Sequence, residues 1–294
     1  MNYCLPLVPY SWVAFAYIFV DRWLLQYYSG SVEQAYYTVA AQFAAIALIF
    51  TTSILRIFWK EIAEAQEQGN NEHVRRLYKK VSRLLFFISA FIAGFLIPWS
   101  EVIISNILGE NYKEGVSTLA IMFLYPVYQT MGQIGGTMLY ASEKALIQSI
   151  IGIVFMVASM IVTYLVLAPS DAFVAGLGLA SEGLALKMVV MQFIQVNVTA
   201  YAIARIWNWS FDWLYQPFGL LCCIGLGWIV NAGATSFIGE MFPWFVTLFV
   251  SGVFYIFLVA ILVYIMPWLI GMTRKEIYLA FNVGFTKLQS FCRV

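Results

Sequence analysis

A lysine and two glutamines stand close together in an apolar stretch of the chain. Gln195 follows Lys187 by eight residues, so the two share one face of a helix, and Gln192 flanks that face. An ammonium group supplies charge and amides supply donors and acceptors, so this face suits a phosphate and sugar hydroxyls. Alternatively, Lys187 extends outward to the lipid headgroups while the amides bond neighbouring helices. The spacing favours neither interpretation.

Two adjacent charged residues, Asp21-Arg22, are predicted to close the first apolar run. Arg22 can line a polar cavity, meet an anionic headgroup or pair with an acidic residue at the same face. Polar groups at membrane depth are costly unless they pair or contact water, so they indicate function. Weaker candidates of this kind are Gln42, Gln129, Gln133 and Asn231.

The residues that usually perform catalysis are scarce. The single histidine, His73, has no nucleophile or metal partner nearby in the sequence, and the four cysteines lack metal-site spacing. No Walker motif and no HExxH motif occurs, which argues against ATP hydrolysis and zinc chemistry. We therefore expect neither an enzyme nor a bound cofactor or metal.

The composition is that of a membrane protein. Of 294 residues, 62% are hydrophobic and 11% are charged, and the mean hydropathy is +0.82. Soluble domains have roughly 45–50% apolar and about 25% charged residues. The net charge of +1 does not suggest nucleic acid as a partner.

Long charge-free runs predict the elements that position these polar residues. A helix needs about 20 apolar residues to cross the hydrocarbon core, and lipid admits only helices or closed barrels. The sequence therefore predicts an all-α polytopic membrane protein with about eight transmembrane helices. The predicted spans are 1–20, 34–55, 84–100, 115–142, 145–170, 188–204, 213–239 and 241–273.

Basic residues predict the orientation of these spans. All but three lysines and arginines fall in the even-numbered gaps, at their edges or in the C-terminal tail, and the exceptions are Arg22, Lys113 and Lys187. Because cytoplasmic loops are enriched in Lys and Arg, both termini are expected in the cytoplasm.

Three further segments are predicted between and after the spans. The polar stretch 59–83 is predicted to be a cytoplasmic helical hairpin, with Asn71 as the N-cap of its second helix. The tail 273–294 mixes basic and apolar residues, as in a helix lying on the membrane. Gly132 and Gly136 form a GxxxG motif that favours close helix packing.

The order of several short motifs resembles the second half of the polysaccharide-biosynthesis flippases. These O-antigen-type exporters belong to the multidrug/oligosaccharidyl-lipid/polysaccharide exporter superfamily. The resemblance spans residues 5 to 205. The segments that carry it are Leu5-Pro6-Leu7-Val8-Pro9, Asp21-Arg22-Trp23-Leu24-Leu25, Tyr36-Tyr37-Thr38-Val39-Ala40, Phe58-Trp59-Lys60-Glu61-Ile62-Ala63-Glu64-Ala65, Leu108-Gly109-Glu110-Asn111-Tyr112, Leu139-Tyr140-Ala141-Ser142-Glu143-Lys144 and Gly176–Gly183.

The resemblance implies a transporter of lipid-linked oligosaccharide in the bacterial inner membrane. Its substrate would be a sugar chain on undecaprenyl diphosphate, and membrane lipids would surround it. Arg22 and Lys187 would be cavity cations, and Asp21 would pair with Arg22 or couple an ion. The side chains expected to meet sugar or phosphate oxygens are Gln133, Gln192 and Gln195.

The resemblance also implies a division of the chain. Residues 1–205 would form a six-helix bundle, residues 206–272 would add two helices, and residues 273–294 would be the tail. The first span looks like the family's seventh. We therefore expect either a fragment or a chain that assembles with an N-terminal half or partner subunit.

Three alternative functions remain open on the sequence. A drug or cation antiporter of the same superfamily would need a carboxylate deep in a span, and no span shows one at its middle. A membrane-embedded glycosyltransferase or polymerase would need a sizeable loop with acidic, Arg or His clusters, and the loops are short. An interaction subunit without transport activity is the third.

Overall fold

The chain forms a helical bundle in a computed structural model, which describes residues 7–237 and 242–276. No strand occurs in these two ranges, which confirms the all-α class for the described chain. The longer helices are α1 (Leu7–Glu67), α2 (Asn71–Leu96), α5 (Tyr125–Ala141), α6 (Ala145–Leu167), α7 (Ala180–Ile206), α8 (Tyr215–Phe237) and α9 (Trp244–Ile265). The shorter ones are η1 (Ile97–Trp99), α3 (Ser100–Ile103), η2 (Ile104–Leu108), η3 (Glu110–Gly115), α4 (Val116–Met122) and η4 (Pro267–Ile270).

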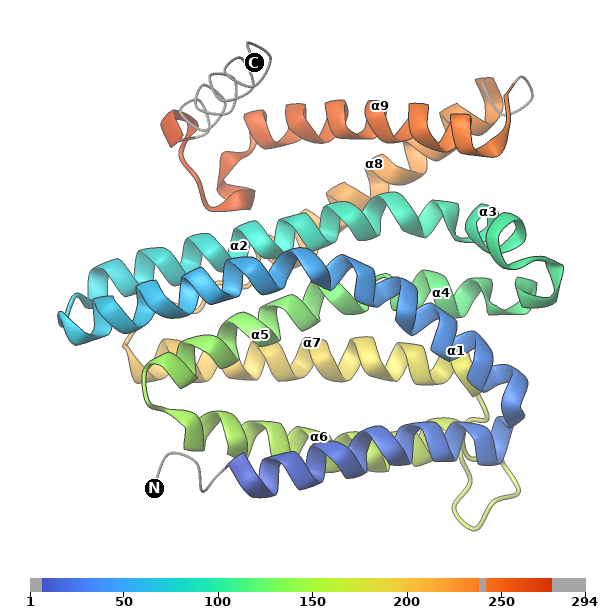
Figure 1. The fold of residues 1–294 in the computed structure, drawn as a ribbon, viewed down its shortest axis with the longest axis horizontal. Coiled ribbons are helices and arrows are strands. Elements are labelled where there is room, and N and C mark those ends of the chain that lie inside the picture. The colour runs from blue at the N-terminus through green and yellow to red at the C-terminus, as the bar shows by residue number, and fades with distance from the viewer. Residues whose placement is uncertain (1–6, 238–241, 277–294) are drawn as a thin grey trace, which may run out of the picture.

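Helix α1 turns back on itself at Gly30 (Figure 1). Gly30 has a φ of 86°, a conformation that residues with a Cβ rarely adopt. Tyr17 and Ala45 line one small cavity, although a straight helix would hold them about 42 Å apart. The first limb of α1, residues 7–29, therefore runs antiparallel to the second limb, residues 31–67. Asp21 lies inside the first limb, so the helix continues past Asp21-Arg22, where the sequence predicted the first apolar run to end.

A helical hairpin joins the second limb of α1 to α2. The turn uses Gly69, with a φ of 67°, and the side chain of Asn70 accepts a hydrogen bond of 3.1 Å from the backbone N–H of His73. Asn70 is thus the N-cap, one residue before the predicted Asn71. The tail expected on the membrane surface lies outside the described residues from 277 onward.

The predicted span 115–142 is broken into two helices. Helix α4 ends at Met122, and α5 begins at Tyr125 with Pro126 in its first turn. Proline lacks the N–H that would bond to the carbonyl of Met122, and its ring clashes with that carbonyl in a continuous helix. The break therefore follows from the position of Pro126.

Five helices of the described chain are long and apolar enough to cross a membrane. They are Asn71–Leu108, Ala145–Leu167, Ala180–Ile206, Tyr215–Ser236 and Trp244–Ile265. A sixth is the pair Leu7–Ile49 and Ile54–Glu67, bent by 51°, if it counts as one span. This number is lower than the predicted eight, because α1 holds two predicted spans and α4 and α5 are each short.

The polarity of the helix faces is inverted relative to a soluble protein. Helix α9 buries Thr247, Ser251, Tyr255 and Val259. Its large apolar side chains, including Phe249, Phe254 and Phe257, are exposed. Helix α6 likewise buries Ser149, Ser159 and Thr163 and exposes Ile150, Val154 and Ile161. An apolar exterior of this extent needs lipid to cover it, so the chain is a multi-pass membrane protein.

Helices α8 and α9 cover the bundle beside α2 (Figure 1). A Cβ at Gly227 of α8 would overlap the carbonyl oxygen of Gly94 in α2, so the two backbones touch. The Tyr255 hydroxyl of α9 donates toward the carbonyls of Phe91 and Cys223, each 3.1 Å away. These contacts fix the last two long helices to the rest of the molecule.

The connections between helices gather at two ends of the bundle (Figure 1). One end, here called the hairpin end, holds the α1–α2 turn, the α5–α6 turn and the α7–α8 connection. The opposite end holds the Gly30 turn, the η2–η3 segment and the long α6–α7 loop.

Candidate functional site

A cavity of about 600 Å³ lies among the first limb of α1, α5, α6 and α7. Its walls carry many polar side chains for an otherwise apolar bundle. The amides and phenols among the lining residues are Gln129, Gln133, Gln148, Gln192, Gln195, Tyr10, Tyr17, Tyr125 and Tyr140. No Lys, Arg, Asp or Glu lines it among the described residues. The cavity is therefore rich in hydrogen-bonding groups but carries no formal charge.

Helical spacing places these groups on the inner faces of their helices. On α5, Gln129, Gln133 and Tyr140 follow the i, i+4, i+11 positions of one face. On α7, Gln192 and Gln195 lie three residues apart and both reach the cavity. Sequence periodicity therefore places these polar groups on one face of each helix.

Glycine lets α5 approach the amides of its neighbours. A Cβ at Gly132 would lie 2.7 Å from Nε2 of Gln192, and one at Gly136 would lie 3.5 Å from Nε2 of Gln148. Both glycines line the cavity. The GxxxG motif, expected to serve close packing, therefore also shapes the space in which the amides meet.

Two of the cavity amides have a buried oxygen without a protein partner. These are Oε1 of Gln133 and Oε1 of Gln148. A buried acceptor without a hydrogen bond costs roughly 1–3 kcal/mol. Each of these amides therefore has an unused acceptor, and its side chain must rotate before that oxygen can meet a ligand in the cavity.

A buried ion pair lies beside the cavity. Lys187 Nζ donates to both carboxylate oxygens of Asp21, at 2.9 and 2.7 Å, and the Thr163 hydroxyl donates to Oδ1 at 2.6 Å. The side chains of Lys187 and Asp21 are 0% and 6% exposed. The pair joins α1, α6 and α7, because each helix supplies one of these three residues.

Tyr17 links the ion pair to the cavity. Its ring centre is 4.6 Å from Lys187 Nζ, and its hydroxyl is 3.5 Å from the same nitrogen. The same hydroxyl donates to Sδ of Met188 at 2.9 Å, and Tyr17 also lines the cavity. One side of this phenol therefore faces the cavity and the other side faces the ammonium group.

The structure places the residues predicted for the site in three locations. It brings Gln133, Gln192 and Gln195 together in the large cavity. Lys187 is held by Asp21 and lies two turns inside α7. Arg22 is exposed and lines a smaller cavity of about 210 Å³, which shares Tyr17, Ile18, Tyr125 and Met188 with the large one.

Several residues of the site were not foreseen from the sequence. Thr163 and Gln148 on α6 and the tyrosines of α1 and α5 belong to it. A signal for α6 existed, since its buried side carries the polar residues Gln148, Ser149, Ser159 and Thr163. The tyrosines gave none, because tyrosine is common at membrane interfaces for anchoring.

Comparison of the chain with family models, curated proteins and solved structures found no match. The cavity and the ion pair are therefore the features from which a function can be inferred.

Proposed function

We propose that the protein is a transporter that moves lipid-linked oligosaccharide across a bacterial inner membrane. The observation that carries the proposal is the uncharged cavity of glutamines and tyrosines. Each amide offers two donors and an acceptor, which matches the alternating donors and acceptors of sugar hydroxyls. Phenol rings add flat apolar surfaces on which the C–H faces of sugars can pack.

In this proposal the chain crosses the membrane eight times. The two limbs of α1 count as two, α4 with α5 as one broken crossing, and α2, α6, α7, α8 and α9 as one each. Discontinuous helices that line a cavity are typical of transporters, since unwound backbone is tolerated where it is not exposed to lipid.

The hairpin end faces the cytoplasm in this proposal. Arg75, Lys79, Lys144 and Arg205 all belong to elements or turns at that end, whereas Lys113 belongs to the opposite end. The excess of Lys and Arg marks the cytoplasmic side. The two ends of the described chain, Leu7 and Glu276, then lie on the cytoplasmic side.

The Asp21–Lys187 pair is the group that couples transport to an ion. Binding of a proton or cation at Asp21 would weaken its hold on Lys187 and release α7 from α1. Since α1, α6 and α7 all border the cavity, a change in their contacts changes access to it. Rocking of helix groups around a fixed site is the usual form of alternating access.

The same pair favours a second candidate, the drug or cation antiporter. The sequence indicated no carboxylate deep in a span, but Asp21 is buried inside the bundle. An antiporter of this kind would carry organic cations in exchange for the ion at Asp21. The two candidates predict different cargo for one cavity.

A flipping assay tests the proposed function. Proteoliposomes would hold a fluorescent lipid-linked oligosaccharide, and a lectin outside would report sugar that reaches the outer leaflet. Q192L should slow flipping by about tenfold, because it removes hydrogen bonds of roughly 1–2 kcal/mol. Q42L is the matched control, since Gln42 is exposed on the second limb of α1 and lies outside the cavity.

Three outcomes would contradict the proposal. Wild-type protein that flips no faster than empty liposomes excludes oligosaccharide transport by this chain. Equal rates in Q192L and Q42L exclude the glutamine cavity as the path. Ion-driven uptake of a cationic dye, without sugar flipping, favours the antiporter.

A further inference from the structure

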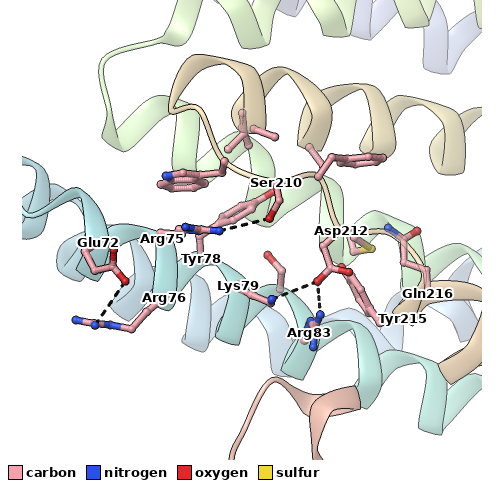
Figure 2. A pocket seen from close by; sticks show the side chains of 17 residues that line it. Glu72, Arg75, Arg76, Tyr78, Lys79, Arg83, Ser210, Asp212, Tyr215 and Gln216 are labelled. Carbon is pink, nitrogen blue, oxygen red and sulfur yellow. Dashed lines mark hydrogen bonds and ion pairs between the residues drawn. The ribbon is translucent and has the colours of Figure 1, made fainter.

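A second pocket, separate from the glutamine cavity, lies at the hairpin end (Figure 2). It has a volume of about 270 Å³ and lies between α2, α7 and the α7–α8 connection. It shares no lining residue with the large cavity. Tyr78, Trp209 and Phe211 give it aromatic walls.

The pocket carries an excess of positive charge. Four cations line it, namely Arg75, Arg76, Lys79 and Arg83, against the carboxylates of Glu72 and Asp212. Two net positive charges are therefore left uncompensated by the lining residues.

Three of the cations, Arg75, Arg76 and Lys79, make only long contacts with their partners in the described chain. Lys79 Nζ is 3.6 Å from Asp212, and Arg76 Nη1 is 3.8 Å from Glu72. Arg75 reaches only the neutral hydroxyl of Ser210, at 3.4 Å (Figure 2). Charge-assisted hydrogen bonds to an anion are normally about 2.7–2.9 Å. These cations retain donors for a stronger acceptor.

Arg83 forms the inner wall of the pocket. Its side chain is 10% exposed, donates to the carbonyl of Trp268 at 2.6 Å and pairs with Asp212. Its guanidinium lies 5.1 Å from the ring centre of Tyr215. Nε of Arg83 is buried and has no partner within the described chain. Arg83 is therefore held in place by Asp212 and Trp268, and it contributes its charge to the inner end of the pocket.

We propose that this pocket binds a phosphate-bearing anion. Arg75 and Lys79 contribute donors from one face of α2, and Arg guanidinium groups match phosphate oxygens in pairs. Ser210 adds a hydroxyl from the α7–α8 connection, so the ligand would tie that connection to α2. The phosphate can come from the headgroup of an anionic phospholipid or from a soluble phosphate ester. The site stands independently of the proposed sugar transport.

The first test measures binding of two probes to the purified full chain. Inorganic pyrophosphate, added in detergent micelles, is the soluble probe and is followed by calorimetry. Phosphatidylglycerol against phosphatidylcholine in nanodiscs is the lipid probe, followed by lipid retention in native mass spectrometry. The test variant is R75Q/K79Q, and the control K60Q/K144Q removes two exposed hairpin-end charges outside the pocket.

The proposal expects R75Q/K79Q to weaken binding by about tenfold or more, because each lost charged donor is worth over a kcal/mol. K60Q/K144Q should stay within twofold of wild type. If R75Q/K79Q weakens binding of phosphatidylglycerol alone, the ligand is a lipid headgroup. If it weakens binding of pyrophosphate alone, the ligand is a soluble phosphate ester. Equal affinities in both variants, or no binding of either probe to wild type, would overturn the site.

A second measurement needs no variant. An amine-acylating reagent labels wild-type protein, and peptide mass spectrometry gives the labelling rate at each lysine. The bound probe should slow acylation of Lys79 at least about threefold, since the ligand covers its Nζ, and leave Lys60 unchanged. A rate at Lys79 that falls no more than that at Lys60 contradicts the proposal.

Discussion

Asp21 and Lys187 form a buried ion pair, and the fold must compensate for removing both charges from water. Its attraction offsets the desolvation of two ions only while both partners are present and hydrogen-bonded. Thr163 satisfies one carboxylate oxygen further, which makes the pair part of a small network across three helices. Stability is therefore expected to be sensitive to either residue of the pair, and the proposed ion coupling depends on the same contact.

Removing one partner of the pair is expected to destabilise the protein strongly. K187M should lower the free energy of unfolding by about 3–5 kcal/mol, because it leaves the Asp21 carboxylate buried and unpaired. Adding D21N to K187M should restore much of the loss. The matched control is K60M, which breaks an exposed pair with Glu64 and should cost less than about 1 kcal/mol.

Thermal unfolding in detergent, with the same protein and lipid content, checks this prediction. The double variant separates a true pair from two independent effects. If K187M and K60M unfold at the same temperature, the pair is not the buried network described here.

Glu276 is a titrating group outside the membrane-spanning helices. Hydrogen bonds from Lys80, at 2.7 Å, and from the N–H and hydroxyl of Thr273 lower the pKa of its carboxyl to about 2, against an ordinary value of 4.5. A lowered pKa means that the contact contributes fully above about pH 4.5 and is lost as the pH falls toward 2.

Carbon-13 NMR of the Glu276 carboxyl measures this pKa directly. The midpoint is expected near 2 in wild type and closer to 4.5 in K80Q, which removes the largest cause of the shift. The control K275Q alters a neighbouring charge that is not among the causes of the shift. A wild-type midpoint at 4.5 would exclude the Lys80 contact.

The site residues could be predicted from the sequence only in part. Gln192 and Gln195 follow from helical spacing, because residues three and four apart share a face. The partner of Lys187 did not follow, because Asp21 is 166 positions away and tertiary packing alone brings the two together. Charged residues usually mark span ends, so the sequence predicts an interfacial position for Asp21, whereas the carboxylate is buried.

At the scale of the helices, close packing depends on a few small residues. The α2–α8 contact is made at Gly94 and Gly227, where the two backbones meet. G227L should force these helices apart and destabilise the protein by about 2 kcal/mol or more, because the backbone of α2 cannot shift aside as a flexible side chain would. Thermal unfolding provides the measurement.

The control for this contact lies on the same helix. A Cβ added at Gly225 would meet nothing within 4 Å, so G225L should leave the unfolding temperature nearly unchanged. If G227L and G225L unfold at the same temperature, the Gly94–Gly227 contact does not hold α8 in place.

Helix positions were predictable to the extent that they depend on local chemistry. Apolar runs placed α6, α8 and α9 near their observed ranges, and Gly69 and Asn70 mark the hairpin turn. The turn at Gly30 falls in the gap between the predicted spans 1–20 and 34–55, so the sequence placed this reversal of the chain as well. Pro126 separates α4 from α5 inside a run that composition alone predicts to be continuous.

At the scale of the whole molecule, apolar side chains pack the core and also cover much of the exterior, while a set of polar groups is enclosed within the bundle. The cavity amides, the ion pair and the buried hydroxyls of α6 and α9 occupy the interior, while large apolar side chains cover the exterior. In the proposed transporter, this arrangement would shield a polar ligand from the hydrocarbon. The central claim is that the glutamine cavity holds the sugar during this passage.

Protection of single cysteines by substrate tests that claim most directly. In a chain whose cysteines at positions 4, 222, 223 and 292 are replaced by serine, Q133C and Q192C report on the cavity, and K60C reports on an exposed position outside it. Lipid-linked oligosaccharide is expected to slow labelling by a polar thiol reagent about tenfold at the two cavity positions and not at K60C. Labelling at Q133C and Q192C that is unchanged by the substrate would contradict the account.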